Sequence, residues 1–224
     1  MTGRKKAVWL AILLCVVFFA GCDSLGLGRK DKDIQLTPEE KEKAELLGKI
    51  DRKFEDPQTH YELGQLYQAE GRWAEAENQY NITLGFDPVH RQAQAARIKV
   101  LQNSGDTEKA KLLTNIYMEQ ASSSASASLN LALAFQKQQM DEHALQSYQQ
   151  ALRLAPNSAA INKQIGYYYL SKNDKERAKD YLSRSFNLNR DQPEVAGELG
   201  RLGVMIQRKQ KTKESVKQLD KIVK

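Results

Sequence analysis

The sequence predicts an all-α protein, built as a solenoid of stacked helical hairpins with an N-terminal helix before the stack and capping helices after it. Residues that favour strands are sparse, whereas alanine, glutamine, glutamate, lysine and leucine are abundant, as is typical of helical chains. Alanine recurs at a step of 34 residues, at Ala76, Ala110, Ala144 and Ala178, and such a period indicates a repeat architecture. The 224 residues, 41% of them hydrophobic, suffice for one array with a buried core.

The first 21 residues have the layout of an export signal. Basic residues at 4–6 precede an apolar run at 7–20, which is shorter than the roughly 20 residues of a membrane-spanning helix. The run ends in Phe19-Ala20-Gly21-Cys22, which resembles the lipobox of bacterial lipoproteins. That resemblance implies cleavage after residue 21 and acylation of Cys22. The alternative is an uncleaved signal anchor, and in both cases the body of the protein is exported.

The lipoprotein resemblance also implies a location. Lipoprotein acylation supplies more than one acyl chain, whereas a single chain of myristoyl size attaches only marginally. We therefore expect a bacterial cell membrane protein that faces the periplasm. Asp23 resembles the inner-membrane retention signal of enteric lipoproteins; the alternatives are an ordinary linker residue and delivery to the outer membrane. Residues 22–36 indicate a flexible tether, because Gly26 and Gly28 loosen the chain and mixed charges keep it solvated.

An N-terminal helix is expected within residues 37–56. Thr37 suits the N-cap, Pro38 suits the first turn, and Glu40 suits the third position of a capping box. The repeats begin after this helix.

Residues 57–192 keep the 34-residue step at several further positions. One phase holds Gly64, Ala132, Gly166 and Gly200, with Ile98 as the exception. Another phase holds Tyr67, Leu101, Phe135 and Tyr169. This pattern resembles the tetratricopeptide repeat, which has Leu-Gly-x-x-Tyr on a first helix, then Ala-x-x-x-Phe/Tyr and a terminal proline on a second.

The resemblance implies four repeat units, at 57–90, 91–124, 125–158 and 159–192. The first unit matches through Leu63-Gly64-Gln65-Leu66-Tyr67 with Ala76, Tyr80 and Pro88. The third matches through Leu131-Ala132 with Phe135, Ala144, Tyr148, Ala151 and Pro156. The second departs most from the pattern, at Arg97, Ile98, Thr114 and Ser122.

The repeated residues have a physical reason. Two antiparallel helices approach closely only where side chains are small, so we expect Gly64, Ala132 and Gly166 to meet the alanines of the second helices. Gly71 and Gly105 suit the turns between helices. Proline ends alternate units, at positions 88 and 156, because it has no N–H with which to continue a helix.

Residues 193–224 are expected to form capping helices that cover the end of the stack. Val204, Val216, Leu219, Ile222 and Val223 recur at helical spacing on one side. Eight basic residues between positions 201 and 224 face only Glu214 and Asp220. The basic face is either solvated or a contact for anionic lipid or an acidic partner.

The repeat resemblance also implies a function for the first helices. In that family they line the inner groove of a right-handed superhelix, which binds other proteins. Amide, aromatic and lysine side chains at the groove positions suit peptide segments. The matching positions are Tyr61, Gln65, Gln68, Lys99, Gln102, Asn103, Leu129, Asn130, Leu133, Gln136, Lys137, Lys163, Gln164 and Tyr167. The carboxylate clamp of some family members is not predicted, because Ala95, Ala160 and Gln164 stand at its positions.

No catalytic or metal site is predicted. Both cysteines, Cys15 and Cys22, lie in the first 22 residues, and the three histidines are scattered. No glycine-rich phosphate loop is present. We therefore expect neither an enzyme nor a bound cofactor, and for an exported protein no nucleic-acid partner. The serine-rich segment at 121–128 is expected to be a loose loop or a hinge.

Together these features predict a membrane-anchored adaptor that recruits or assembles envelope proteins by binding their peptide segments in the groove. A lipoprotein that assists assembly of type IV pilus secretins is one alternative, on fold-level analogy. A structural envelope component that associates with its own copies is another.

Overall fold

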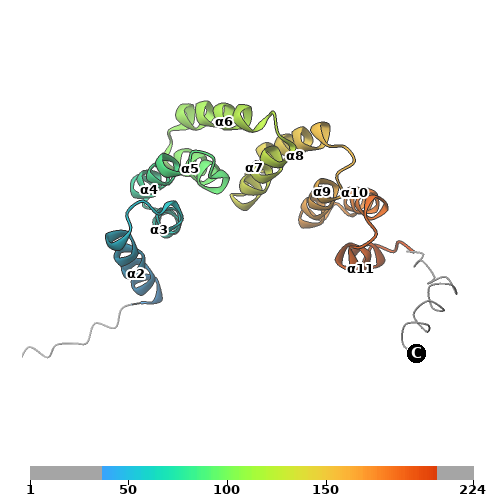
Figure 1. Cartoon of the computed structure of the whole chain (residues 1–224), viewed down its shortest axis with the longest axis horizontal. Helices are drawn as coiled ribbons and strands as arrows, with labels where there is room; N and C mark the ends of the chain where they lie inside the picture. Colours follow the sequence, from blue (N-terminus) through green and yellow to red (C-terminus); the bar gives the residue numbers. More distant parts are fainter. Residues whose placement is uncertain (1–36, 206–224) are drawn as a thin grey trace, which may run out of the picture. The chain divides into compact units, whose positions relative to one another are not determined.

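The computed structural model describes residues 37–205, and these residues form ten α-helices and no strand (Figure 1). The predicted export signal, Cys22, the tether and most of the basic C-terminal cap lie outside the described residues. From Lys41 onward the described chain belongs to one compact unit. The helix bounds are α2 Pro38–Arg52, α3 Pro57–Ala69, α4 Trp73–Phe86, α5 Arg91–Ser104, α6 Thr107–Ala121, α7 Ala125–Lys137, α8 Asp141–Leu154, α9 Ala159–Ser171, α10 Lys175–Leu188 and α11 Pro193–Arg201.

Four helical hairpins follow one another along the chain, namely α3–α4, α5–α6, α7–α8 and α9–α10. The two helices of α5–α6 contact each other less extensively than those of the other hairpins. Between hairpins, α4 packs broadly on α5, and α5 also packs on α7. The contact of α8 with α9 is much narrower.

Helix α2 begins with the predicted capping box. The N–H of Thr37 donates to Glu40 Oε2 at 2.8 Å, and the N–H of Glu40 donates to Thr37 Oγ1 at 3.2 Å. The helix ends at Arg52, four residues short of the predicted limit. Lys43 pairs with Glu70 at the end of α3.

The start of each first helix is fixed by a side-chain N-cap, and these caps also recur every 34 residues. Asp56, His90, Ser124 and Ser158 each accept a hydrogen bond from the backbone N–H three residues later, at 3.1–3.3 Å. Such a cap satisfies a backbone donor that the helix itself cannot. The period is therefore visible in the hydrogen bonding as well as in the core.

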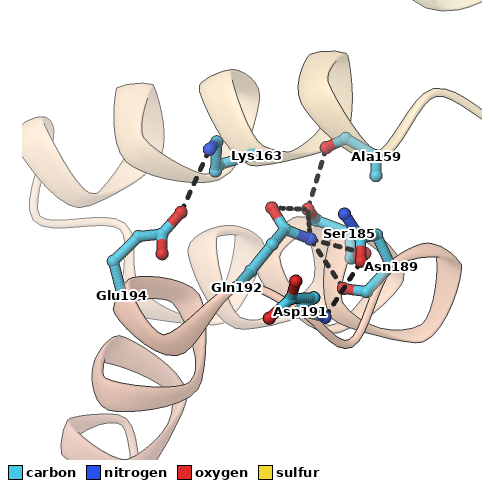
Figure 2. A network of polar contacts seen from close by, with 7 residues as sticks. All are labelled: Ala159, Lys163, Ser185, Asn189, Asp191, Gln192 and Glu194. Carbon is cyan, nitrogen blue, oxygen red and sulfur yellow. Dashed lines mark hydrogen bonds and ion pairs between the residues drawn. The ribbon is translucent and has the colours of Figure 1, made fainter.

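Gln192 stands at the next position of this series, and its side chain does something different (Figure 2). Its Nε2 donates to the backbone oxygens of Asn189 at 2.7 Å and Ser185 at 3.1 Å. The hydroxyl of Ser185 in turn donates to the Ala159 carbonyl at 2.8 Å. The network joins the end of α10 to the starts of α9 and α11.

The turns inside the hairpins share one backbone conformation. Gly71, Gly105, Gln139 and Asn173 lie 34 residues apart and all have positive φ, at 72°, 91°, 57° and 58°. Glycine adopts this left-handed conformation without cost, whereas a side chain with Cβ does not. The third and fourth turns adopt this conformation without a glycine.

The tightest crossings within the hairpins differ from the expectation that small residues meet the second-helix alanines. A Cβ placed on Gly64 would lie 2.6 Å from Tyr80, and one on Gly166 would lie 2.6 Å from Leu182. These residues come four positions after Ala76 and Ala178. The alanines are fully buried, but the nearest atoms to the glycines belong to the next turn of the helix.

Residues 121–128 are mostly helical, so the expected loose loop is wrong. Helix α6 extends to Ala121 and α7 begins at Ala125. Ser124 caps α7, and the hydroxyl of Ser128 donates to the Ala121 carbonyl at 2.8 Å. The serines build a tight junction because they hydrogen-bond to nearby backbone groups.

Candidate functional site

The fourteen predicted groove residues, called here the first-helix positions, lie on α3, α5, α7 and α9. Their exposure varies widely. Gln102, Asn103, Asn130 and Lys137 are exposed, Tyr61 is buried, and the other nine are intermediate. The fourteen positions are therefore not equivalent as surfaces for a partner.

Helix α3 contacts the C-terminal end of α7, including its C-cap residue Gln138, through four polar side chains, which we call the α3–α7 bridge. Lys137 Nζ donates to the Tyr61 hydroxyl at 3.3 Å and lies 5.6 Å from the centre of its ring. Gln68 Nε2 donates to Gln138 Oε1 at 2.9 Å. These residues are 76 and 70 positions apart in sequence, so first and third hairpins share one face.

Tyr61, one of the residues of the α3–α7 bridge, is itself buried against other aromatic rings. It is 4% exposed, and its ring centre lies 4.9 Å from that of His90 and 5.9 Å from that of Tyr80. Burial lowers the pKa of His90 below its ordinary value, against opposing contributions from Asp87 and the backbone. Neutral His90 also suits the N-cap, since its Nδ1 accepts a hydrogen bond from Ala93.

Two of the predicted amides are fixed by buried tyrosines. The Tyr80 hydroxyl donates to Gln68 Oε1 at 2.7 Å, and the Tyr148 hydroxyl donates to Gln136 Oε1 at 2.6 Å. Burial raises the pKa of both tyrosines well above the ordinary range, so they remain donors. With its oxygen engaged, each amide presents its NH2 group as a donor.

The first-helix positions on α9 have acidic neighbours on α11. Lys163 Nζ pairs with Glu194 Oε1 of α11 at 3.1 Å (Figure 2). Burial, then the charges of Glu194 and Glu198, raise the pKa of Tyr167. Tyr167 is thus a half-buried phenol beside two carboxylates.

Sequence reasoning did not identify Gln138, Glu194 or Glu198 as members of this surface. Gln138 directly follows a predicted position, but its contact with α3 depends on how the hairpins stack. Glu194 and Glu198 lie on α11, whose Leu199 and Gly200 continue the 34-residue step. That continuation was the signal that a fifth first helix contributes to the surface.

Among residues 37–205, no group of three or more histidine, cysteine, aspartate or glutamate residues is arranged to hold a metal ion. No helix in the same residues combines the length and apolar character needed to cross a membrane.

Two family models identify the repeat in part of the chain. Profiles of the tetratricopeptide repeat match residues 127–160 and 162–192, which contain the hairpins α7–α8 and α9–α10. Protein O-mannosyl-transferase TMTC1 of Homo sapiens is 27% identical over 145 residues, which cover 62% of this chain. The chain spans 16% of the length of that protein.

Several solved structures are similar to the chain in part. PilF of Pseudomonas aeruginosa is 26% identical, with 65% of this chain and 67% of that chain covered and a TM-score of 0.38. MamA of Desulfovibrio magneticus RS-1 is 19% identical, with coverage of 86% and 99% and a TM-score of 0.36. YrrB, described as having an unusual peptide-binding site, is 16% identical, with coverage of 71% and 82% and a TM-score of 0.38.

Proposed function

We propose that this array of tetratricopeptide repeats mediates protein–protein interactions, and that it binds peptide segments of envelope proteins through the first-helix positions. The observation that carries this proposal is the chemistry of those positions. They combine amides, lysines and two tyrosine rings on the first helices of successive hairpins, and several of them are exposed. Amides pair with peptide main chain, while rings and leucines supply desolvated contact.

The contacts favour one part of this surface for the partner. On α3 and α7, Tyr61, Gln68 and Lys137 already bind side chains of the protein itself. On α7 and α9, Asn130 is exposed, and Gln164 and Tyr167 are half-exposed. We assign the main partner contacts to this second group, beside Glu194 and Glu198. A segment with a basic or amide-rich character fits these carboxylates.

The proposal includes a membrane anchor at Cys22 and a location facing the periplasm, with the inner membrane favoured by Asp23. Acyl chains at Cys22 would confine the binding surface to the membrane and so raise its effective concentration toward neighbouring partners. The action is passive recruitment, without catalysis. Assembly of pilus secretins and self-association into a structural envelope component are the alternatives to this function.

A crosslinking experiment tests the binding surface. A photoreactive phenylalanine analogue replaces Gln164 in the full-length protein in cells, and the captured proteins are identified. The same analogue at Lys179, which is exposed on the second helix α10, serves as the matched control. We expect a partner captured from Gln164 only, and its loss on Tyr167→Ala. Equal capture from both positions would contradict the proposal.

The anchor is tested separately with Cys22→Ser. We expect this variant to lose metabolic labelling by an alkyne fatty acid and to leave the membrane fraction. If the wild-type protein takes up no label, the lipoprotein part of the proposal is wrong, while the binding part still stands.

A further inference from the structure

A cleft lies between the second helices α6 and α8, away from the first-helix positions. Its volume is about 560 Å³, within the range of ligand-binding sites. Helix α6 contributes Asn115, α7 contributes Ser128, and α8 contributes Gln146, Ser147 and Gln149. The cleft therefore joins the second hairpin to the third.

The cleft exists because two small residues stand where the other hairpins carry larger ones. The position of Ser128 is held by His60, Gln94 and Asn162 in the other three hairpins. These three side chains are buried and reach back to a carbonyl six residues earlier, at 2.7–3.2 Å.

The position of Ser147 shows the same difference in size. In the other hairpins this position is occupied by a larger residue, namely Gln79, Leu113 or Tyr181. Gln79 bonds to His60 at 2.8 Å, and Tyr181 stacks on Tyr169 at 5.6 Å between ring centres. The volume that these side chains occupy elsewhere is empty beside Ser147.

The walls of the cleft are suited to peptide main chain. Ser147 is 3% exposed, and its Oγ makes no hydrogen bond to any group in residues 37–205. Rotation about one bond redirects this hydroxyl, which both donates and accepts. Asn115, Gln146 and Gln149 are exposed amides on the two sides, and each also both donates and accepts. An extended peptide presents the same alternation of N–H and C=O groups.

An apolar strip borders the cleft on α6. Leu112 is 59% exposed and Ile116 is 40% exposed. Leu112 lies three residues before Asn115, and Ile116 lies three residues before Glu119; Asn115 and Glu119 both line the cleft, so the apolar strip adjoins the cleft wall on the helix surface. Large apolar side chains exposed next to a polar cleft are typical of protein-interaction surfaces.

We propose that the cleft between α6 and α8 is a second binding site, which takes an extended polypeptide segment of a partner protein. The amides and Ser147 pair with the main chain of this segment, and a large apolar side chain of the segment packs on Leu112 and Ile116. The site is independent of the first-helix positions, so the protein can hold two segments at once.

The probe is a phage-displayed library of 12-residue linear peptides. The library is selected on the protein that begins at residue 22, with Cys22 replaced by serine. Clones that need the cleft are those that fail to bind Ser147→Tyr, which installs the residue that the fourth hairpin carries at this position. We expect the selection to yield such clones, and we expect their affinity to fall at least tenfold in the surface variant Gln149→Ala as well. Binding should be unchanged in Tyr167→Ala, which alters the first-helix positions only.

Two measurements keep the outcome clear. Gln149→Ala changes an exposed residue, so a loss of binding there cannot come from failure to fold, and circular dichroism checks this. In the selected peptide, methylation of a central backbone nitrogen should weaken binding at least tenfold, and a helix-favouring α-aminoisobutyric acid should also weaken it. Tighter binding of the α-aminoisobutyric acid peptide, binding lost only with Tyr167→Ala, or no clone sensitive to Ser147→Tyr would overturn the proposal.

Discussion

The first and third hairpins are built alike, and the second and fourth differ from them. In α3–α4 and α7–α8, a buried tyrosine of the second helix bonds to a glutamine of the first, as Tyr80 does to Gln68. In α5–α6 and α9–α10 the corresponding residues are Thr114 and Leu182. The second helices of this latter pair instead begin with an aspartate N-cap, Asp106 or Asp174. The array therefore alternates with a period of two hairpins.

The comparison teaches that each hairpin preserves the combined size of two facing residues rather than their identity. The residue pairs are Gly64 with Tyr80, Ile98 with Thr114, Ala132 with Tyr148, and Gly166 with Leu182. A small residue on one helix stands opposite a large one on the other, and the second hairpin reverses the order. Interiors are packed at nearly constant density, so the crossing requires this compensation. Ile98, an exception to the sequence pattern, is explained by the small Thr114.

The largest expected effect on stability comes from replacing the facing residues of the second hairpin, Ile98 and Thr114, by the alanine and tyrosine of the third. Ile98→Ala removes a fully buried side chain and should cost about 2–5 kcal/mol of unfolding free energy. Thr114→Tyr alone overpacks the site and should cost about 1–3 kcal/mol. In the double variant the new tyrosine fills the space, and Gln102 already stands at the position of Gln68. We expect the double variant to be more stable than the sum of the single changes predicts, by about 0.5–3 kcal/mol.

Urea denaturation of the four proteins measures this coupling. Strict additivity of the two changes would show that the facing residues do not compensate each other.

Gly166→Ala comes next in size. Its Cβ would lie 2.6 Å from Leu182 Cγ and 3.2 Å from the Leu182 backbone nitrogen, so a side-chain rotation cannot relieve the contact. We expect a loss of about 1–3 kcal/mol, reduced by the helix preference of alanine. Gly197→Ala is the matched control, because its Cβ would meet no atom within 4 Å. It should stabilise the protein by up to about 1 kcal/mol; equal effects of the two changes in thermal denaturation would refute the close crossing.

Tyr80→Phe and Tyr148→Phe test the feature that the first and third hairpins share. Each removes a hydroxyl that donates to a glutamine oxygen, while the buried ring remains. We expect each to cost about 0.5–1.5 kcal/mol in unfolding free energy. Tyr167→Phe, at a half-exposed position, should change stability less. If Tyr80→Phe and Tyr148→Phe lower the unfolding free energy no more than Tyr167→Phe does, the hydrogen bonds to Gln68 and Gln136 do not stabilise the fold.

The repeat and its hairpins were predictable from sequence because period and small residues report on them directly. The 34-residue step at Ala76, Ala110, Ala144 and Ala178 was enough for the fold class. The partner atoms at the crossings were not predictable, since a glycine meets Tyr80 rather than Ala76 only through the angle between two helices. Period alone does not contain that angle.

The polar surfaces were harder to predict for a related reason. The α3–α7 bridge joins Lys137 to Tyr61 across 76 residues, and such a contact depends on how three hairpins stack. The cleft at Ser128 and Ser147 is a lack of volume relative to neighbouring hairpins, so it emerges only when the structure aligns them. The serine-rich sequence around it indicated a loop, because serine also favours turns.

His90 predicts a small dependence of stability on pH. Burial lowers its pKa in the folded protein, whereas in the unfolded chain the value is about 6.5. Below about pH 6.5 the unfolded chain therefore binds more protons, so this contribution to stability is complete above that pH and is lost as the pH falls through the interval below it. His90→Asn keeps a capping side chain and should flatten the change in unfolding free energy between pH 7.5 and 5.5. Identical pH profiles of both proteins would exclude His90 as the cause.

Substitutions in the hairpin turns have the smallest expected effect on stability, and they should stabilise the protein rather than destabilise it. The first two turns use Gly71 and Gly105, but the third places Gln139 at a φ of 57°. A residue with Cβ is strained there, so Gln139→Gly should stabilise the protein by about 0.5–1 kcal/mol, after the added backbone entropy of the unfolded chain is subtracted. Asn173→Gly should gain less, because asparagine adopts this conformation more readily. Gln149→Gly, in the middle of α8, should instead cost about 0.5–1 kcal/mol. Chemical denaturation of the three variants distinguishes these signs, and a loss of stability in Gln139→Gly would mean that the third turn is held by side-chain contacts that the first two do not need.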